Sequence, residues 1–202
     1  VTYEPQGFSE VKTPSATYTF QGYVAYVYSY GKELIVVNAS SVPPILQVAT
    51  GLGNELPSAT VSMIGGWSVN VQGYQGSSMY GNYLVVSNKS STFVIDVQNG
   101  NIISSANVNG LILEDSTLVI GSSLYQVVGE TADGTGSTLV VFNLTTKKYT
   151  TFHAMYSGYY LEGTSFYNDY IMVSGVQFYP PSLAVVILNS SGAIVYSNIT
   201  SE

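Results

Sequence analysis

The side chains that could catalyse a reaction are few and poorly placed. The single histidine, His153, lies in a run predicted to be a strand, and no nucleophile-elbow motif accompanies it. Glu114 and Asp115 are adjacent, so on a strand they would face opposite sides and could not act as an acid/base pair. Glu162 and Asp169 could converge from loops, but their spacing does not require it. We therefore predict no catalytic residues and no enzymatic activity.

Metal binding has equally little support in the sequence. The stretch GETADGTGST at 129–138 contains Glu130 and Asp133, but it lacks the density of oxygen ligands of a calcium loop. The chain contains no cysteine, which removes thiolate zinc sites and thiol nucleophiles. Lysine and asparagine side chains could form an isopeptide bond, but the sequence supplies only the residue types. We predict no metal and no cofactor apart from N-linked glycans.

Glycan acceptors are the clearest motif in the chain. The pattern Asn-x-Ser/Thr marks N-glycosylation acceptors, and glycans at such sites point into solvent. Asparagine also suits turns, because its side chain bonds to nearby main chain and it tolerates a left-handed backbone. The predicted acceptors are Asn38, Asn88, Asn143, Asn189 and Asn198.

The composition excludes a nucleic-acid partner. Charged residues make up 8% of the 202 residues, the net charge is −7, and the five cations are all lysines. Nucleic-acid binding needs a basic surface, which this chain cannot supply. No apolar run reaches the roughly 18–20 residues that span a bilayer, so we predict no membrane span. A surface made polar by hydroxyls and amides also favours stability in acid, since few carboxylates can lose charge.

The pattern of apolar residues predicts an all-β protein. Short runs rich in Val, Ile, Tyr and Thr alternate with turns of Gly, Asn and Ser. Four such runs end at Asn38, Asp96, Asn143 and Asn189, which are spaced 58, 47 and 46 residues apart. Around each end we expect a three-strand antiparallel meander, and LILEDSTLVIG at 111–121 could add further strands. About four repeated units predict a propeller-like fold, with a two-sheet β-sandwich as the alternative.

A Gly- and Tyr-rich insertion at 51–81 lengthens the first repeat. It contains the only tryptophan, Trp67, followed by Tyr74 and Tyr80. Aromatic rings of this kind can stack on sugars, so these three residues are candidate ligand contacts. The alternative is that the insertion forms one or two extra strands with loose turns. We treat 21–202 as one all-β head domain.

The first 20 residues have no counterpart in the repeat. Two prolines argue against a central strand, yet alternating apolar and polar residues could form one face of a strand. We predict an extended N-terminal strand that another subunit could accept into its sheet, and the alternative is a disordered end. The residues that would contact the acceptor are Val1, Tyr3, Phe8, Val11, Ala16, Tyr18 and Phe20.

Taken together, these features resemble the thread-type surface filament subunits of thermoacidophilic archaea. The shared features are a β-rich chain, turns dense in glycan acceptors, the absence of Cys and Arg, and the N-terminal strand. The resemblance implies donor-strand assembly of identical subunits, heavy N-glycosylation, and a role in adhesion to cell surfaces or other filaments and in biofilm. Because the chain begins VTYEPQGF without Met, we expect a secreted, extracellular protein with its signal peptide removed.

Two other functions remain open. The first is a monomeric secreted or cell-envelope domain that binds carbohydrate or protein. The second, and weakest, is an enzyme such as a glycoside hydrolase.

Overall fold

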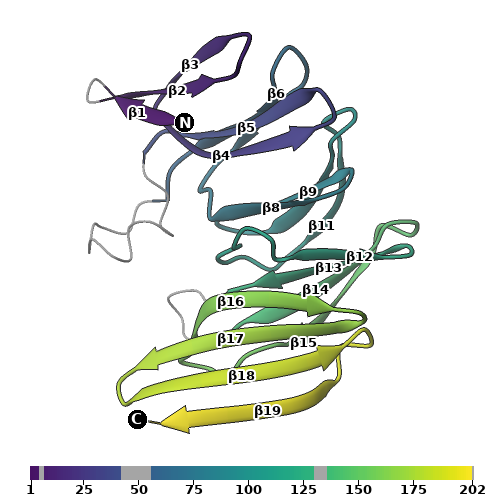
Figure 1. Cartoon of the computed structure of the whole chain (residues 1–202). Coiled ribbons are helices and arrows are strands. Elements are labelled where there is room, and N and C mark those ends of the chain that lie inside the picture. Colours follow the sequence, from purple (N-terminus) through teal and green to yellow (C-terminus); the bar gives the residue numbers. More distant parts are fainter. Residues whose placement is uncertain (5–6, 42–55, 130–135, 202) are drawn as a thin grey trace.

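The protein is built from five antiparallel sheets that follow one another in chain order (Figure 1). The computed structural model describes residues 1–4, 7–41, 56–129 and 136–201. Within these ranges all regular structure is strand. Sheet 1 contains β1 (Thr2–Glu4), β2 (Phe8–Lys12) and β3 (Thr17–Gln21); sheet 2 contains β4 (Tyr23–Tyr30), β5 (Glu33–Ala39), β6 (Ala59–Met63) and β7 (Ser68–Val71); sheet 3 contains β8 (Gly76–Tyr80), β9 (Tyr83–Ser87), β10 (Thr92–Asp96) and β11 (Ile102–Ala106); sheet 4 contains β12 (Thr117–Ile120), β13 (Ser123–Val128), β14 (Thr138–Asn143) and β15 (Tyr149–His153); sheet 5 contains β16 (Tyr160–Tyr167), β17 (Tyr170–Phe178), β18 (Pro181–Asn189) and β19 (Ile194–Ser201).

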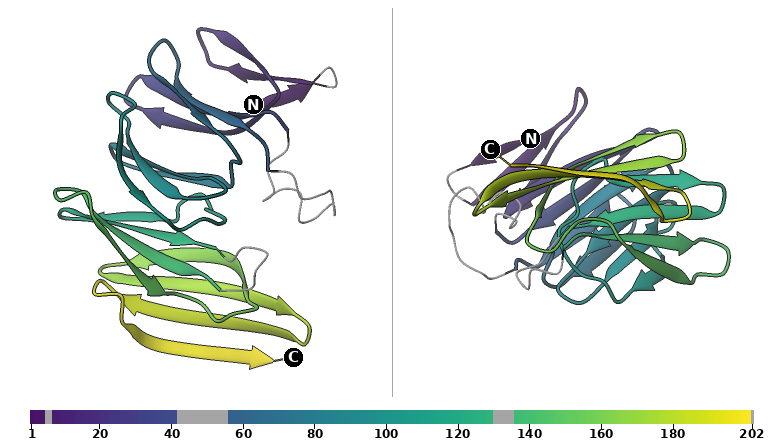
Figure 2. Two further views of the ribbon diagram at one scale, coloured as in Figure 1. Left: turned by 180° about the vertical axis from the view of Figure 1, so that it is seen from behind. Right: turned by 90° about the horizontal axis from the view of Figure 1, so that it is seen from below.

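Sheets 2 to 5 are four-strand meanders in which each strand pairs with the next in sequence. The last strand of each sheet leads directly into the first strand of the following sheet. Sheets 1 and 5 lie at opposite ends of the stack, and the two termini are far apart (Figures 1 and 2). The repeated meander is the propeller-like, all-β fold that the sequence predicts, and here it forms an open series of sheets.

The first hairpin of every four-strand sheet turns at a residue with a left-handed backbone. These residues are Gly31, Gly81, Gly121 and Asn168, with φ of 59°, 57°, 58° and 50°. Glycine adopts this conformation without steric cost, and asparagine tolerates it. The repeated turn sets the register of the first two strands in each sheet.

The hydrophobic core is divided among the contacts between successive sheets. One cluster joins sheets 2 and 3 and includes Ile35, Val61, Leu84 and Ile95. Equivalent clusters join sheets 3 and 4 and sheets 4 and 5. A smaller cluster around Val11 joins sheets 1 and 2. Each sheet is therefore held mainly by its neighbours in the series, as in other repeat folds.

The structure confirms the all-β, propeller-like prediction but corrects the size of the repeat. Each unit has four strands because β8, β12 and β16 precede the three strands that the sequence pattern identified. Asn38 lies in the second strand of its sheet, whereas Asp96, Asn143 and Asn189 end the third strand of theirs. This offset explains the longer first spacing. The insertion at 51–81 supplies β6, β7 and β8, and the predicted strand at 45–49 lies outside the described residues.

The N-terminal segment differs from the extended strand that the sequence predicts. Residues 2–21 contribute three short strands that pair with one another as sheet 1. Val11 is 3% exposed, and Tyr18 and Phe20 pack beside it against sheet 2. The hydroxyl of Ser9 donates to the carbonyl of Gly22 at 2.9 Å and accepts from the amide of Val24 at 3.0 Å. The alternation of apolar residues thus serves this chain's own core.

Candidate functional site

The residues considered for catalysis remain separate in the structure. His153 is exposed at the end of β15, and Glu114 and Asp115 lie in a turn before β12, where the sequence had predicted a strand. Glu162 is in β16 and Asp169 follows its far end, a separation of roughly 20 Å along the strand at ~3.3 Å per residue. Paired carboxylates of glycosidases are only about 5–10 Å apart. Among the described residues, no group of three His, Cys, Asp or Glu side chains could hold a metal.

Some residues that the sequence singled out lie outside the part of the chain that the structure describes. Glu130 and Asp133 of the calcium-loop candidate are not among the residues that the structure describes. The same is true of the side chain of Tyr3 in the N-terminal segment. No helix in the described part of the chain is long and apolar enough to cross a membrane.

The three aromatic residues considered for ligand contact do not form a common surface. Tyr74 is completely buried, and its hydroxyl is 3.0 Å from that of Ser77. Trp67 is partly buried and donates its ring N–H to the carbonyl of Val97 at 2.7 Å. Only Tyr80, which is 44% exposed, presents much of its ring to solvent. Trp67 and Tyr74 therefore belong to the core between sheets 2 and 3.

Three of the predicted glycan acceptors occupy similar hydrogen-bonded turns. The side-chain oxygens of Asn88, Asn143 and Asn189 each accept a main-chain N–H from the residue two positions later, at 2.9, 3.0 and 3.0 Å. In each turn the third residue of the acceptor motif, Ser90, Thr145 or Ser191, is exposed. These bonds use the oxygen of the side chain, so they do not occupy the amide nitrogen to which a glycan would be attached.

The remaining two acceptors have different surroundings. Asn38 lies in β5, where its amide nitrogen donates to the carbonyl of Gln21 at 2.8 Å. Its side-chain oxygen is buried and has no hydrogen-bond partner. Asn198 is exposed on the edge strand β19 and donates to the hydroxyl of Thr200 at 3.3 Å. Attachment at Asn38 would break its bond to sheet 1, whereas Asn198 is accessible.

Asn38 also borders a neutral polar hollow of about 500 Å³ between sheets 1 and 2. Its walls are formed by amide and hydroxyl side chains and one tyrosine, Tyr23, together with Gly7, Gly22 and Ala59. Several of these groups already pair with one another, as where Ser58 donates to Gln72 at 2.8 Å. The lining contains no charged residue, so the hollow suits neutral, polar ligands better than ions.

The most unusual surface is on sheet 5. Among the residues that the structure describes, eleven of the fifteen exposed large hydrophobic side chains belong to residues 160–199. The chain has no Asp, Glu, Lys, Arg or His between Asp169 and Glu202, so little charge interrupts this surface. Sequence reasoning missed it because the strands resemble ordinary core strands. The long interval without charge was the available signal.

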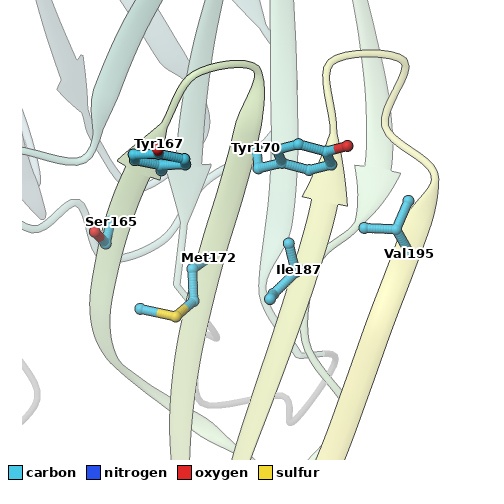
Figure 3. Close-up of a pocket in the computed structure, with 6 residues that line it drawn as sticks. All are labelled: Ser165, Tyr167, Tyr170, Met172, Ile187 and Val195. Atoms are coloured by element: carbon cyan, nitrogen blue, oxygen red, sulfur yellow. The ribbon is translucent and has the colours of Figure 1, made fainter.

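Figure 3 shows the hollow in this surface, which has a volume of about 380 Å³. It is lined by side chains from all four strands: Ser165, Tyr167, Tyr170, Met172, Ile187 and Val195. Only Ser165 and the two phenol groups are polar. The arrangement can bind an apolar surface, and none of the six residues that line it is Asp, Glu, His, Lys or Cys.

The comparisons with known proteins bear on the fold. No protein-family model and no curated protein matches the chain. Among solved structures, BamB from Moraxella catarrhalis, a β-propeller, is 13% identical with a TM-score of 0.56, covering 92% of this chain and 56% of that one. Hydrazine synthase from Kuenenia stuttgartiensis is 14% identical with a TM-score of 0.56, covering 85% and 47%. The chain thus spans about half the length of these structures, and the likeness shows the fold alone.

Proposed function

We propose that the protein is a non-catalytic, N-glycosylated structural domain that assembles with other polypeptides at a cell surface. The observation that carries this proposal is the exposed apolar surface of sheet 5. Soluble proteins rarely expose contiguous apolar patches of this kind unless the patch is an interaction site. The widely separated carboxylates and the turn-borne glycan acceptors are consistent with a role in contact and display.

The filament function implied by the sequence is one form of this proposal. Donation of residues 1–20 to a neighbouring subunit would require sheet 1 to leave its own chain and expose Val24 and Val36. Sheet 1 could serve as the acceptor instead. It has three strands where the other sheets have four, and β1 pairs with β2 on one side only within the described residues. A strand from another subunit could extend it there by main-chain hydrogen bonds.

Negative-stain electron microscopy of protein from its native source tests this function. We expect ordered assemblies, with filaments as the form that identical subunits joined head-to-tail would give. Mass spectrometry of glycopeptides from the same material should find sugar at Asn88, Asn143 and Asn189, and little at Asn38. Dispersed, unglycosylated particles would contradict the proposal.

A second candidate function is supported by the neutral hollow beside Asn38. Its amides and hydroxyls, together with Tyr23, fit a neutral carbohydrate. Titration with neutral oligosaccharides, followed by NMR, should shift signals of Asn70 and Gln72 if this function is correct. Tyr80 serves as the control, because it lies outside the hollow and should not respond.

A further inference from the structure

The outer face of sheet 5 is the side turned away from sheet 4. The strand register assigns its members, since Met172 is opposite Ile187, Ile187 is opposite Tyr196, and Val185 is opposite Asn198. The alternate residues Ile171, Val173 and Val186 point the other way and are buried against sheet 4. The larger apolar members of the outer face are Tyr160, Tyr167, Tyr170, Met172, Phe178, Leu183, Ile187, Val195 and Tyr196.

The outer face of sheet 5 resembles the faces that pack between successive sheets, but no sheet among the described residues covers it. At each of the four junctions along the series, buried apolar side chains from two successive sheets meet. The outer face of sheet 5 has apolar side chains of the same kind, but eight of them are between 41% and 77% exposed. In Figure 1 no other described segment lies beyond β16–β19.

The opposite end of the series is polar. On the outer face of sheet 1, Glu10 is opposite Thr19, and Lys12 is opposite Thr17. Lys12 and Glu10 form an ion pair at 2.9 Å there. Terminal repeats with a polar outer face act as caps of a repeat array. A head-to-tail contact between sheet 5 of one copy and sheet 1 of the next would bury these charges against apolar side chains, which is unfavourable.

We propose that the outer face of sheet 5 packs against the same face of a second copy of this chain. This inference rests on the proposed role in assembly and names the surface and partner. A twofold pair would bring two uncharged apolar faces together as a sheet-on-sheet contact about 10 Å thick. The polar sheet 1 of each copy would then lie at the two free ends.

The area of the face is sufficient for a stable pair. Aromatic side chains bury about 150–250 Å² each, so the five on this face, which are about half exposed or more, offer roughly 400–600 Å² per copy, to which Met172, Leu183 and Val195 add. Specific interfaces bury about 800 Å² per partner. The residues that the register places on this face include no charged side chain. The nearest charges are Glu162, which is exposed at the bulge of β16, and Asp169 in the β16–β17 turn, so a pair must leave both at its rim in contact with water.

Asn198 gives the proposal a second, chemical consequence. It lies on the outer face, opposite Val185, on the exposed strand β19. A glycan at this residue would project from the face and prevent two copies from meeting. Pairing through sheet 5 and glycosylation at Asn198 are therefore mutually exclusive, whereas a glycan at Asn88, on sheet 3, is compatible with the pair.

Sedimentation of the unglycosylated full chain over a range of concentrations tests the proposal. We expect a monomer–dimer equilibrium. Met172→Glu and Leu183→Glu place a carboxylate in the face and should each weaken the dimer by at least about 100-fold. Both side chains are exposed in the single chain, so the fold should tolerate the changes. Thr19→Glu, on the outer face of sheet 1, is the matched control and should leave the dimer unchanged.

Single cysteines provide a direct map because the chain has none of its own. Met172→Cys, Leu183→Cys and Tyr196→Cys sample the face, and at least one should give a disulfide-linked dimer that reductant dissolves. Thr19→Cys should not.

A chain that stays monomeric at all concentrations would overturn the proposal, as would a dimer that survives both glutamate substitutions. Open-ended polymers of the wild-type chain would overturn the closed pair. In each case, ordered assemblies of native material would still support the proposed function. A glycan at Asn198 in the assembled native protein would also overturn the pairing.

Discussion

At the scale of single residues, a buried phenol cluster links stability to alkaline pH. The hydroxyls of Tyr28 and Tyr74 lie 2.9 and 3.0 Å from that of Ser77, in the core between sheets 2 and 3. Burial raises the pKa of both phenols above the ordinary value of 10.0. A raised pKa means that the folded state holds its proton more tightly than the unfolded state does. The stabilisation is therefore complete below pH 10 and decreases as pH rises above it.

We expect the chain to unfold cooperatively in alkali, with phenolate absorbance from this cluster appearing together with the loss of the β-sheet circular dichroism signal. Tyr74→Phe removes one ionising group and should move the alkaline midpoint to higher pH. Phenolate formation by Tyr28 and Tyr74 while the sheets remain folded would contradict the assignment.

At Gly100 both the backbone conformation and the packing oppose any larger residue. Its φ is 75°, and an added Cβ would lie 2.5 Å from the ring of Trp67. We expect Gly100→Ala to lower the free energy of unfolding by about 2–4 kcal/mol, combining left-handed backbone strain with displacement of the ring. Fluorescence of Trp67, the only tryptophan, reports that displacement.

Gly31→Ala is the matched control for this change. Gly31 also has a positive φ, of 59°, but nothing lies within 4 Å of its added Cβ. It should therefore cost only the backbone strain, about 1 kcal/mol, and leave the Trp67 emission unchanged. Equal losses in the two variants would show that the ring contact is unimportant.

The acceptor asparagines could be read from the sequence, but their surroundings could not. The motif needs only three consecutive residues, and the preference of Asn for turns correctly suggested that several acceptors lie in turns. The bond from Asn38 to Gln21 joins positions from two sheets, and no local pattern encodes it. The burial of Tyr74 was missed for the same reason, because neighbours from β4 and β8 cover it.

At the scale of elements, sheet 1 stabilises the chain that contains it. Val11 is 3% exposed and packs with Val24 and Val36. We expect Val11→Ala to lower the free energy of unfolding by about 1–3 kcal/mol, measured by urea denaturation. Thr19→Ala, on the exposed face of the same sheet, should change it by less than about 0.5 kcal/mol. Equal, negligible effects would favour a segment that is free to leave for another subunit.

The strands that the sequence revealed were the ones with long β-branched runs. Core strands such as β9 and β14 have near-continuous apolar sequences, whereas β8, with the sequence GSSMY, carries three small polar residues or glycine. The serines of β8 are buried and hydrogen-bonded, which apolar periodicity does not detect. The repeated turn at Gly31, Gly81 and Gly121 was the signal that could have placed the first strands.

At the scale of the whole molecule, the series of sheets has unequal ends. Local sequence can specify a meander, but how many meanders pack together and where the series stops depends on contacts between distant sheets. Charge distribution gave a partial indication. The outer face of sheet 1 carries Glu10 and Lys12, while β17 to β19 carry no Asp, Glu, Lys, Arg or His. Once the structure had assigned residues to sheets, the positions of the charged residues in the sequence showed which end of the series is polar and which is apolar.

This arrangement predicts a gradient of local stability along the series. Sheets 3 and 4 are packed on both faces, whereas sheet 5 is packed on one, and every residue of β19 is exposed. Local opening requires less free energy where fewer apolar contacts are lost. In dilute solution we expect amide hydrogen exchange to be slowest in β9, β10, β13 and β14 and fastest in β19.

Raising the protein concentration separates this gradient from assembly. If sheet 5 pairs with a second copy, the apolar contacts of its outer face form only in the dimer. Amide exchange in β17 to β19 should therefore become slower as the dimerised fraction of the chain rises with concentration. Protection of β9 and β10 should increase less in openings that leave sheet 5 folded, because sheet 3 is already covered in the single chain, whereas exchange through complete unfolding gains the free energy of dimerisation in every sheet. Protection of β17 to β19 that does not change with concentration would contradict pairing through sheet 5.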